Sequence, residues 1–327
     1  MRVLVTGMGG HLGTRVAQFL EARDDVEAVA GFDFVPPRRR LQRATFKRID
    51  PRDRDRLVAF VQDFAPTAVA HFGVYEPAAR MDNRSAAVST EECTVNALGA
   101  AVRAGALDRV VVRSGLEVYG RRRGGPRVPD EHAPLGPTTP YGRICLDVEA
   151  HAAGIARRHD IPVASLRLAP VSGSRAPSPI GRLLRLPAVP VPALADPPFQ
   201  LLHTDDAARA MLEALVRGAD GAFNVVGPGA ASPWQAIRLG NRIPVPFAGP
   251  GWLVARGIAE LAGSPVPPHV LELIRAGRVA DGARAVEELG LRNLVPTQEV
   301  VADLYAWASV TALPGTVSSG TVREAGA

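Results

Sequence analysis

Lysine is almost absent from this chain, whose 327 residues include a single lysine, Lys47, while every other basic residue apart from histidine is arginine. Cysteine is nearly as rare, with Cys93 and Cys145 alone. Two cysteines provide no disulfide framework, so we expect a reducing, cytoplasmic environment. No apolar run approaches the roughly 18 residues of a membrane helix, and the first residues lead into a strand pattern rather than a signal peptide. We therefore expect no membrane span.

Aromatic residues make up only 5% of the chain, and none interleaves with its two arginine runs, at 38–40 and 121–123. The net charge of +5 alone would permit nucleic acid or acidic small molecules as partners. Without a nucleic-acid-binding motif, solvated loops are the favoured interpretation of both runs. We expect a small-molecule substrate and no nucleic acid. Because Arg121 follows a strand end, binding of a phosphorylated substrate near the run 121–123 stays open as an alternative.

The first 33 residues have the order strand, glycine loop, helix, strand and acid. After the apolar run 3–5 come Gly7, Gly10 and Gly13, and Asp33 closes the second apolar run. Gly7 allows a tight turn, Gly10 lets a pyrophosphate approach the backbone, and Gly13 lets the helix pack closely on the sheet. The helix N-terminus favours phosphates. Asp33 is placed to accept hydrogen bonds from ribose hydroxyls and would repel a 2′-phosphate, so this pattern predicts an NAD site. A plain strand–helix turn is the alternative.

Strands alternate with helices over about the first 170 residues, which predicts an α/β fold with a doubly wound parallel sheet of the Rossmann type over 1–169. The expected helices are 11–23, 53–64, 89–106 and 141–159, and the third begins at a capping-box pattern at 89–92. The expected strands are 3–5, 27–32, 46–49, 68–72, 110–112 and 163–169.

Beyond residue 170 the alternation stops, and prolines crowd the stretch 177–198. A strand at 200–203, a helix at 204–217 and a strand at 223–226 are expected to contribute to the first domain. Short helices at 180–186, 232–241, 251–262, 266–276 and 281–289 predict a smaller, mixed substrate-type domain, interleaved over 170–311. The small, polar tail 312–327 is expected to be disordered.

Further motifs follow the TGxxGxxG loop in a fixed order. They are Asp50, the HFGV at 71–74, the NALG at 96–99, the VYG at 118–120, the PYGR at 140–143, the HTDDAA at 203–208 and the FNV at 223–225. Over about residues 1–308 this series resembles the NAD-dependent epimerase/dehydratase branch of the extended short-chain dehydrogenase/reductase family. The resemblance implies NAD as cofactor and a nucleotide sugar or related polar alcohol as substrate. It implies a homodimer through helices 89–106 and 141–159, and cofactor contacts from Gly7, Gly10, His11, Leu12, Gly13, Asp33, Asp50, Phe72 and Gly73.

The family's reaction uses a tyrosinate that removes a hydroxyl proton, a Ser or Thr that shares the hydrogen bond, and a lysine. The resemblance gives the tyrosine role to Tyr141. Where the lysine belongs stands Cys145, and where the Ser or Thr belongs stands Gly115, with Ser114 beside it. Since an unperturbed tyrosine has a pKa of about 10, loss of the lysine's charge removes what makes it a base near neutral pH. We take Tyr141 and Ser114 as catalytic candidates, with Glu117 as a weaker one.

Two functions therefore stay open. The first is an NAD-dependent epimerase/dehydratase-like enzyme that works by transient hydride transfer. The second is a catalytically degenerate NAD(H)-binding or protein-docking module, which an intact glycine loop beside an incomplete catalytic set would suit. A metal site is not expected, because nothing else converges on the one candidate cluster, His203 with Asp205 and Asp206.

Overall fold

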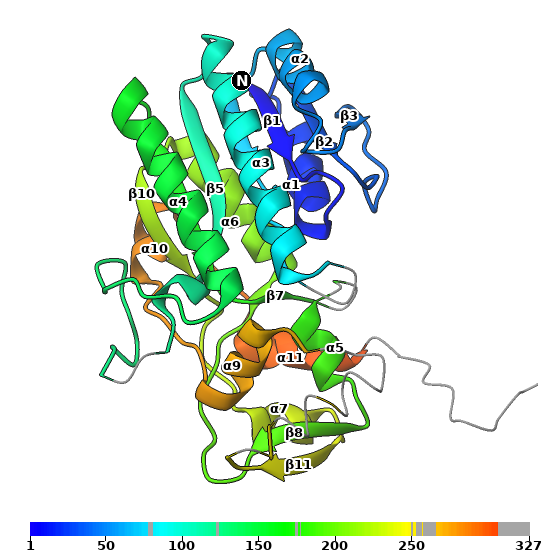
Figure 1. Cartoon of the computed structure of the whole chain (residues 1–327), viewed down its shortest axis with the longest axis vertical. Helices are drawn as coiled ribbons and strands as arrows, with labels where there is room; N and C mark the ends of the chain where they lie inside the picture. The colour runs from blue at the N-terminus through cyan, green and yellow to red at the C-terminus, as the bar shows by residue number, and fades with distance from the viewer. Residues whose placement is uncertain are drawn as a thin grey trace, which may run out of the picture.

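A computed structural model describes residues 1–77, 81–121, 124–173, 176, 178–249, 251–252, 257 and 266–306. Its centre is a seven-stranded sheet in the order β10-β6-β5-β4-β1-β2-β3, in which every pairing is parallel (Figure 1). The strands are β1 Arg2–Thr6, β2 Ala28–Asp33, β3 Thr45–Arg48, β4 Ala68–His71, β5 Arg109–Gly115, β6 Val163–Leu168 and β10 Gly221–Val225. The predicted α/β, Rossmann-type parallel sheet is confirmed.

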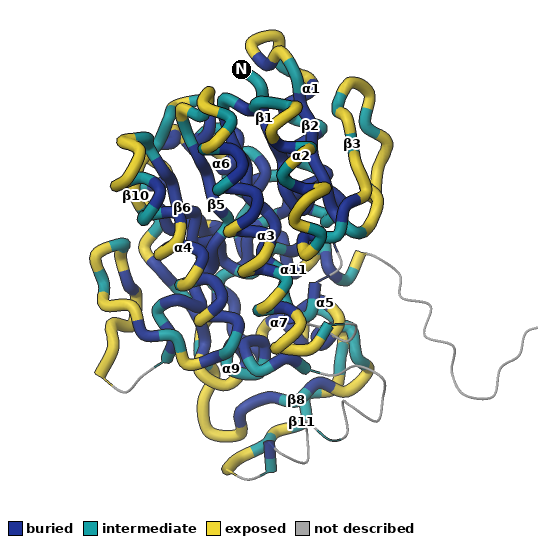
Figure 2. Tube along the Cα trace, turned by 45° about the horizontal axis from the view of Figure 1, so that its top comes forward, coloured by how far each residue is buried: buried dark blue, intermediate teal, exposed yellow. Residues whose placement is uncertain are grey.

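Helices cover both faces of this sheet, so its inner strands are buried on both sides and are mostly apolar, whereas the edge strand β3 is mostly exposed (Figures 1 and 2). Because strand side chains alternate between faces, Val3 and Val5 join one core cluster and Leu4 joins the other. One face carries α1 His11–Glu21 and α6 Thr204–Arg217, and the opposite face carries α2 Arg54–Phe64, α3 Asn83–Arg103 and α4 Pro140–His159. Among the described residues, no helix is both long and apolar enough to cross a membrane.

Helix α3 begins at Asn83, so the start predicted at residue 89 is wrong. Asp82 is the N-cap, and its side chain accepts a hydrogen bond from the Ser85 N–H at 2.7 Å. The capping-box pattern lies inside the helix, where the Thr90 hydroxyl accepts a hydrogen bond from the Tyr75 N–H instead of capping α3. The first turn of α3 is polar, so the apolar pattern of the sequence did not reveal that the helix begins at Asn83 and not at residue 89. The homodimer through α3 and α4 stays a prediction.

A smaller part lies beyond the carboxyl ends of the strands, where its helices share one apolar cluster with a two-stranded sheet (Figure 1). It contains α5 Pro179–Leu184, β8 Ala188–Pro192, α7 Pro233–Leu239, β11 Ile243–Phe247, α9 Pro268–Ala276 and α11 Thr297–Ala306. Connecting elements are the 3₁₀ helix η1 Leu116–Tyr119, β7 Val171–Ser172, β9 Leu202–His203 and α10 Ala283–Glu288. The domain division at residue 170 stays a prediction.

Three elements of this part, β8, β11 and α11, and the connecting strand β7 were not expected. Both β8 and β11 contain prolines, which argue against a strand in sequence, but a two-stranded ladder has free edges that tolerate them. The strand expected at 200–203 is confined to 202–203. Most of the helix expected at 251–262, and the whole tail 312–327, lie outside the described residues.

Candidate active site

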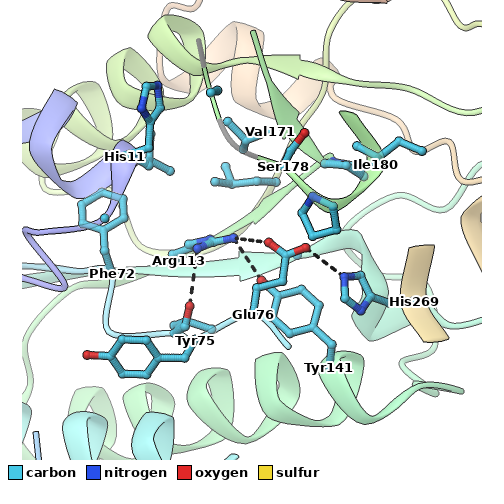
Figure 3. A pocket seen from close by; sticks show the side chains of 18 of the residues that line it. His11, Phe72, Tyr75, Glu76, Arg113, Tyr141, Val171, Ser178, Ile180 and His269 are labelled. Atoms are coloured by element: carbon cyan, nitrogen blue, oxygen red, sulfur yellow. Dashed lines mark hydrogen bonds and ion pairs between the residues drawn. The ribbon is translucent and has the colours of Figure 1, made fainter. Parts of the chain in front are cut away.

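A cavity of about 560 Å³ lies at the carboxyl ends of the central strands, between the sheet and the smaller part (Figure 3). This is where parallel α/β sheets bind ligands. Nine of the predicted site residues line it, namely Gly7, Gly10, His11, Leu12, Asp33, Phe72, Ser114, Tyr141 and the weaker candidate Glu117. The other three, Gly13, Asp50 and Gly73, are not among its lining residues. The glycine loop and the candidate base thus share one cavity.

The glycine loop has the geometry of a phosphate cradle. Gly7 has a φ of +63°, and a Cβ there would lie 2.6 Å from the Phe72 carbonyl oxygen. A Cβ on Gly13 would lie 2.3 Å from the Gly7 carbonyl oxygen, so Gly13 serves the packing of α1. Gly10 is the N-cap of α1 and has no side chain to cap it. The N–H groups of the first turn are therefore available to an anionic ligand.

Asp33 closes β2 beside this loop and is only 2% exposed. Its carboxylate accepts a hydrogen bond from the Phe34 N–H at 2.7 Å. Burial raises the pKa of Asp33 to about 6, against the opposing effect of backbone N–H groups that include those of Gly9 and Gly10. A buried carboxylate next to the helix start suits the two hydroxyls of a ribose.

Asp50 and Gly73 have other surroundings. Asp50 forms an ion pair with Arg52 at 2.6 Å, and this guanidinium holds the pKa of the Asp50 carboxyl below its usual range. A Cβ on Gly73 would lie 2.2 Å from the Cys93 sulfur, so Gly73 allows α3 to pack close to the end of β4. Their roles toward the cofactor stay predictions.

Tyr141 stands in the first turn of α4, two residues after the Thr139 N-cap, and is 4% exposed. Its hydroxyl accepts a hydrogen bond from Nη2 of Arg113 at 3.1 Å (Figure 3). Arg113 belongs to β5 and also lines the cavity. Sequence reasoning missed Arg113. The available signal was a charged residue directly after Val110–Val112, within a strand whose neighbours are apolar.

Two further ionisable groups complete this cluster. Glu76 lies 3.6 Å from the Arg113 guanidinium, and a hydrogen bond of 2.8 Å links its other oxygen to Nε2 of His269. The His269 ring is 4.8 Å from the Tyr141 ring. Burial would raise the pKa of Glu76, but His269 and Arg113 hold it below its usual value. Burial also raises the pKa of Tyr141 well above its usual value, and Arg113 opposes that rise.

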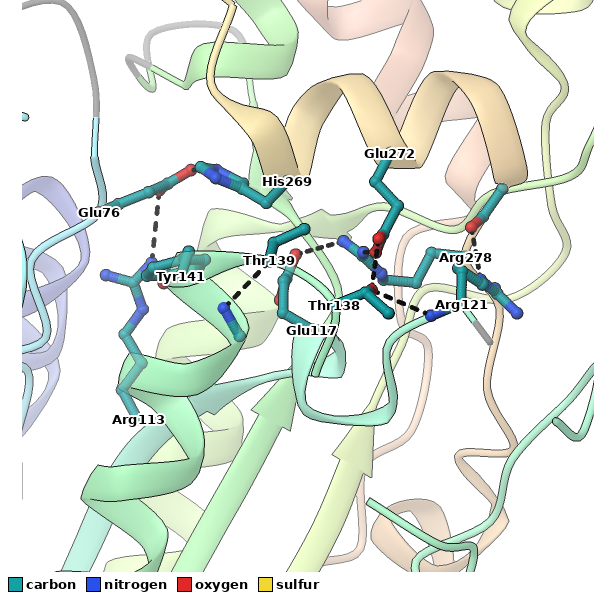
Figure 4. Close-up of polar contacts among 12 residues, drawn as sticks. Glu76, Arg113, Glu117, Arg121, Thr138, Thr139, Tyr141, His269, Glu272 and Arg278 are labelled. Atoms are coloured by element: carbon teal, nitrogen blue, oxygen red, sulfur yellow. Dashed lines mark hydrogen bonds and ion pairs between the residues drawn. The ribbon is translucent and has the colours of Figure 1, made fainter. Parts of the chain in front are cut away.

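The positions of the missing Ser/Thr and lysine are both occupied. A Cβ on Gly115 would lie 2.3 Å from Glu117 Oε2 and 3.7 Å from the Cys145 sulfur. The Glu117 carboxylate therefore fills the space that a Ser or Thr side chain would need. Its other oxygen binds Nη1 of Arg278 at 2.6 Å, and both side chains are buried (Figure 4). Burial raises the pKa of the Cys145 thiol, so that group is neutral.

Ser114 is oriented away from this cluster. Its hydroxyl donates to Glu149 at 2.5 Å, and Glu149 is held in turn by Arg167 at 2.8 Å. Since side chains alternate along β5, Arg113 and residue 115 share one face of the strand and Ser114 belongs to the other. The geometry argues against Ser114 as the hydrogen-bond partner of Tyr141. Within the described part of the chain, no cluster of three His, Cys, Asp or Glu residues could hold a metal ion.

Comparison with known proteins gives the same family and fold. The model of the NAD dependent epimerase/dehydratase family matches residues 3–226. An uncharacterized protein of Mycobacterium tuberculosis is 31% identical over 345 residues, which cover 99% of this chain and 89% of that relative. UDP-glucose 4-epimerase of Streptomyces lividans is 31% identical over 184 residues, 53% of each protein. The crystal structure of UDP-glucose 4-epimerase from Brucella ovis in complex with NAD has a TM-score of 0.72 at 21% identity, covering 92% of this chain and 96% of that one.

Proposed function

Because the chain belongs to the NAD-dependent epimerase/dehydratase family, whose cofactor is NAD, we propose that it transfers hydride between NAD and a carbon bearing a hydroxyl group on a nucleotide sugar or related polar alcohol. The observation that carries this proposal is the shared cavity, in which the glycine loop and Asp33 lie at one end and Tyr141 at the other. The curated relative named UDP-glucose 4-epimerase supports a nucleotide sugar as the substrate class.

The residues present suit NAD. The uncapped start of α1 at Gly10 would hold the pyrophosphate, and the buried Asp33 carboxylate would accept hydrogen bonds from the adenosine ribose. When bound, NAD⁺ supplies a hydride acceptor. The Tyr141 phenolate would take the proton of the substrate hydroxyl as the C–H hydride leaves, so that the alcohol carbon becomes a carbonyl and two electrons pass to the cofactor. Arg182 of α5 adds a positive charge to the substrate end of the cavity, where it suits a diphosphate.

The test begins with calorimetric titration of the protein with NAD⁺ and with NADP⁺. We expect NAD⁺ to bind more tightly. Turnover of a panel of nucleotide sugars is then followed by reduced-cofactor absorbance and by product chromatography. Tyr141→Phe should lower the rate about 10²–10⁴-fold, the usual contribution of a general base. Tyr305→Phe is the matched control, because that hydroxyl bonds to the Leu184 carbonyl outside the cavity. Unchanged turnover in Tyr141→Phe would remove this residue from the mechanism.

A second candidate is a catalytically degenerate NAD(H)-binding or protein-docking module. The observation that favours it is the Glu117 carboxylate, which occupies the space of the family's Ser or Thr side chain. It requires that NAD⁺ binds while no substrate of the panel yields reduced cofactor or a new product. Failure of both NAD⁺ and NADP⁺ to bind would reject the enzyme and the NAD(H) sensor together, leaving the docking role.

A further inference from the structure

We propose that Arg113 is the positioning residue for Tyr141: its guanidinium supplies, from the sheet, the positive charge that the family's lysine supplies from α4. The catalytic consequence rests on the proposed function, but the contact itself does not. Tyr141 and Arg113 come from different elements, α4 and β5, and meet in the cavity at 3.1 Å between the phenol oxygen and Nη2 (Figure 3).

The place of Arg113 near the carboxyl end of β5 lets its long side chain reach the phenol. Along β5, Val111 packs in the cluster of α1 and α6, whereas Val110 and Val112 pack in the cluster of α4, so Arg113 leaves the strand on the face of Val111. Its guanidinium nevertheless meets the Tyr141 hydroxyl of α4 at 3.1 Å and acts on the pKa of Cys145, which follows Tyr141 by four residues on that helix. The guanidinium and the position of the absent lysine are thus close together. A lysine at 145 would bring a second cation next to Arg113, so the two cation sources are alternatives.

The guanidinium is held in place by contacts that leave its charge directed at the phenol. The Val74 carbonyl oxygen accepts a hydrogen bond from Nη1 at 3.4 Å. Glu76 lies farther from Nη2, at 3.6 Å, than the phenol oxygen does, and its other carboxylate oxygen is engaged by His269. His269 therefore competes with Arg113 for Glu76. An arginine also keeps its charge at any working pH, so it can act as a permanent cation beside the base.

The competing explanation is that Arg113 is only the structural ion-pair partner of Glu76. The two explanations differ in what happens to the ionisation of Tyr141. A structural pair predicts lower stability and an unchanged phenol when Arg113 is replaced. A positioning cation predicts that the phenolate becomes harder to form, because an opposite charge within about 4–6 Å favours the charged form by 1–3 pKa units.

The experiment titrates Tyr141 directly, in protein labelled with a fluorinated tyrosine that is more acidic than tyrosine. The chain has four tyrosines, and the Tyr141 signal is assigned in the ¹⁹F NMR spectrum as the one lost in Tyr141→Phe. Arg113→Met removes the charge and keeps the length, and Arg113→Lys restores a charge. Arg143→Met is the matched control, since it removes an arginine two residues from Tyr141 on the exposed side of α4.

We expect Arg113→Met to raise the titration midpoint of Tyr141 by about 1–3 pH units, Arg113→Lys to raise it by less, and Arg143→Met to leave it unchanged. If the methionine variant does not fold, Arg113→Gln keeps an amide for the Val74 carbonyl and should give the same upward shift. A folded Met or Gln variant with the wild-type midpoint would overturn the proposal.

The pH profile of turnover should move in the same direction as the NMR midpoint. Absence of NAD⁺ binding in a wild-type protein with a normal Arg113-dependent midpoint would reject the proposed function and leave the Arg113 contact standing.

Discussion

At the scale of single residues, the assignment of Asp33 to the ribose predicts that cofactor binding depends on pH. Burial raises the pKa of its carboxyl to about 6, and under this assignment the ionised form is the one that would accept hydrogen bonds from both ribose hydroxyls. Because this pKa is raised to about 6, the Asp33 carboxyl of the free protein becomes protonated as the pH falls through about 6. Affinity for NAD⁺ should therefore be constant above pH 7 and fall about tenfold for each unit below pH 6.

Calorimetry with NAD⁺ between pH 5 and 8 measures this dependence. Asp33→Asn should bind more weakly and lose the pH dependence, because an amide does not titrate in that range. Asp205→Asn is the control for a carboxylate near the start of α1, since Asp205 pairs with Arg15 and does not line the cavity. A flat wild-type profile would contradict the assignment of Asp33 to the ribose.

The residues that sequence reasoning found and missed differ in how far apart they are in the chain. Gly7, Gly10 and Asp33 belong to one continuous strand–loop–helix–strand unit, so their spacing alone predicted that they lie together, and all three line the cavity. Glu76 and His269 are 193 residues apart, and only the folded chain brings them together. Arg113 was missed for a different reason: the local signal, a charged residue within an apolar strand, does not reveal that its side chain meets Tyr141 of another element.

At the scale of elements, the start of α3 can be tested, because the capping-box pattern at 89–92 and the observed N-cap Asp82 predict different effects of mutation. Asp82→Ala should lower the free energy of unfolding by about 1 kcal/mol, since it removes the acceptor for the Ser85 N–H. Ser89→Ala is the matched control. Ser89 lies inside the helix, so this change should be neutral or stabilising by about 0.5 kcal/mol. Urea unfolding of both variants checks the difference, and a larger loss in Ser89→Ala would move the helix start back to residue 89.

The elements that were predicted well are those whose apolar residues form a clear run or repeat regularly along the sequence. Strand β1 contains the apolar run Val3–Val5 because both faces of the sheet are covered there, and α6 has one apolar stripe. The missed strands β8 and β11 gain their stability from tertiary packing against α7 and α9, which their proline-rich sequences do not reveal.

At the scale of the whole molecule, Arg278 ties the C-terminal part to the end of the sheet. It is 2% exposed and binds Glu117, just after β5, and Glu272 of α9, both at 2.6 Å (Figure 4). Arg278→Met leaves Glu117 buried and unpaired, and we expect a loss of about 3–5 kcal/mol in the free energy of unfolding.

Arg217→Met is the control for this change, because Arg217 pairs with Glu213 on the partly exposed side of α6. Such a helix pair contributes about 0.3–0.5 kcal/mol. Chemical denaturation followed by circular dichroism compares the two variants. Equal losses would mean that the buried pair does not hold the parts together.

The position of β10 in the sheet also sets a condition on synthesis of the chain. Strand β6 ends at residue 168, but its neighbour β10 is not made until residues 221–225, after the whole α5-to-α6 stretch. Until then the backbone of β6, whose residues are all buried in the finished fold, has an unpaired edge. An edge of that kind is a template for pairing with another chain. A ribosome that stalls between these two strands would therefore release a fragment prone to aggregate, whereas release after residue 225 would leave the sheet complete.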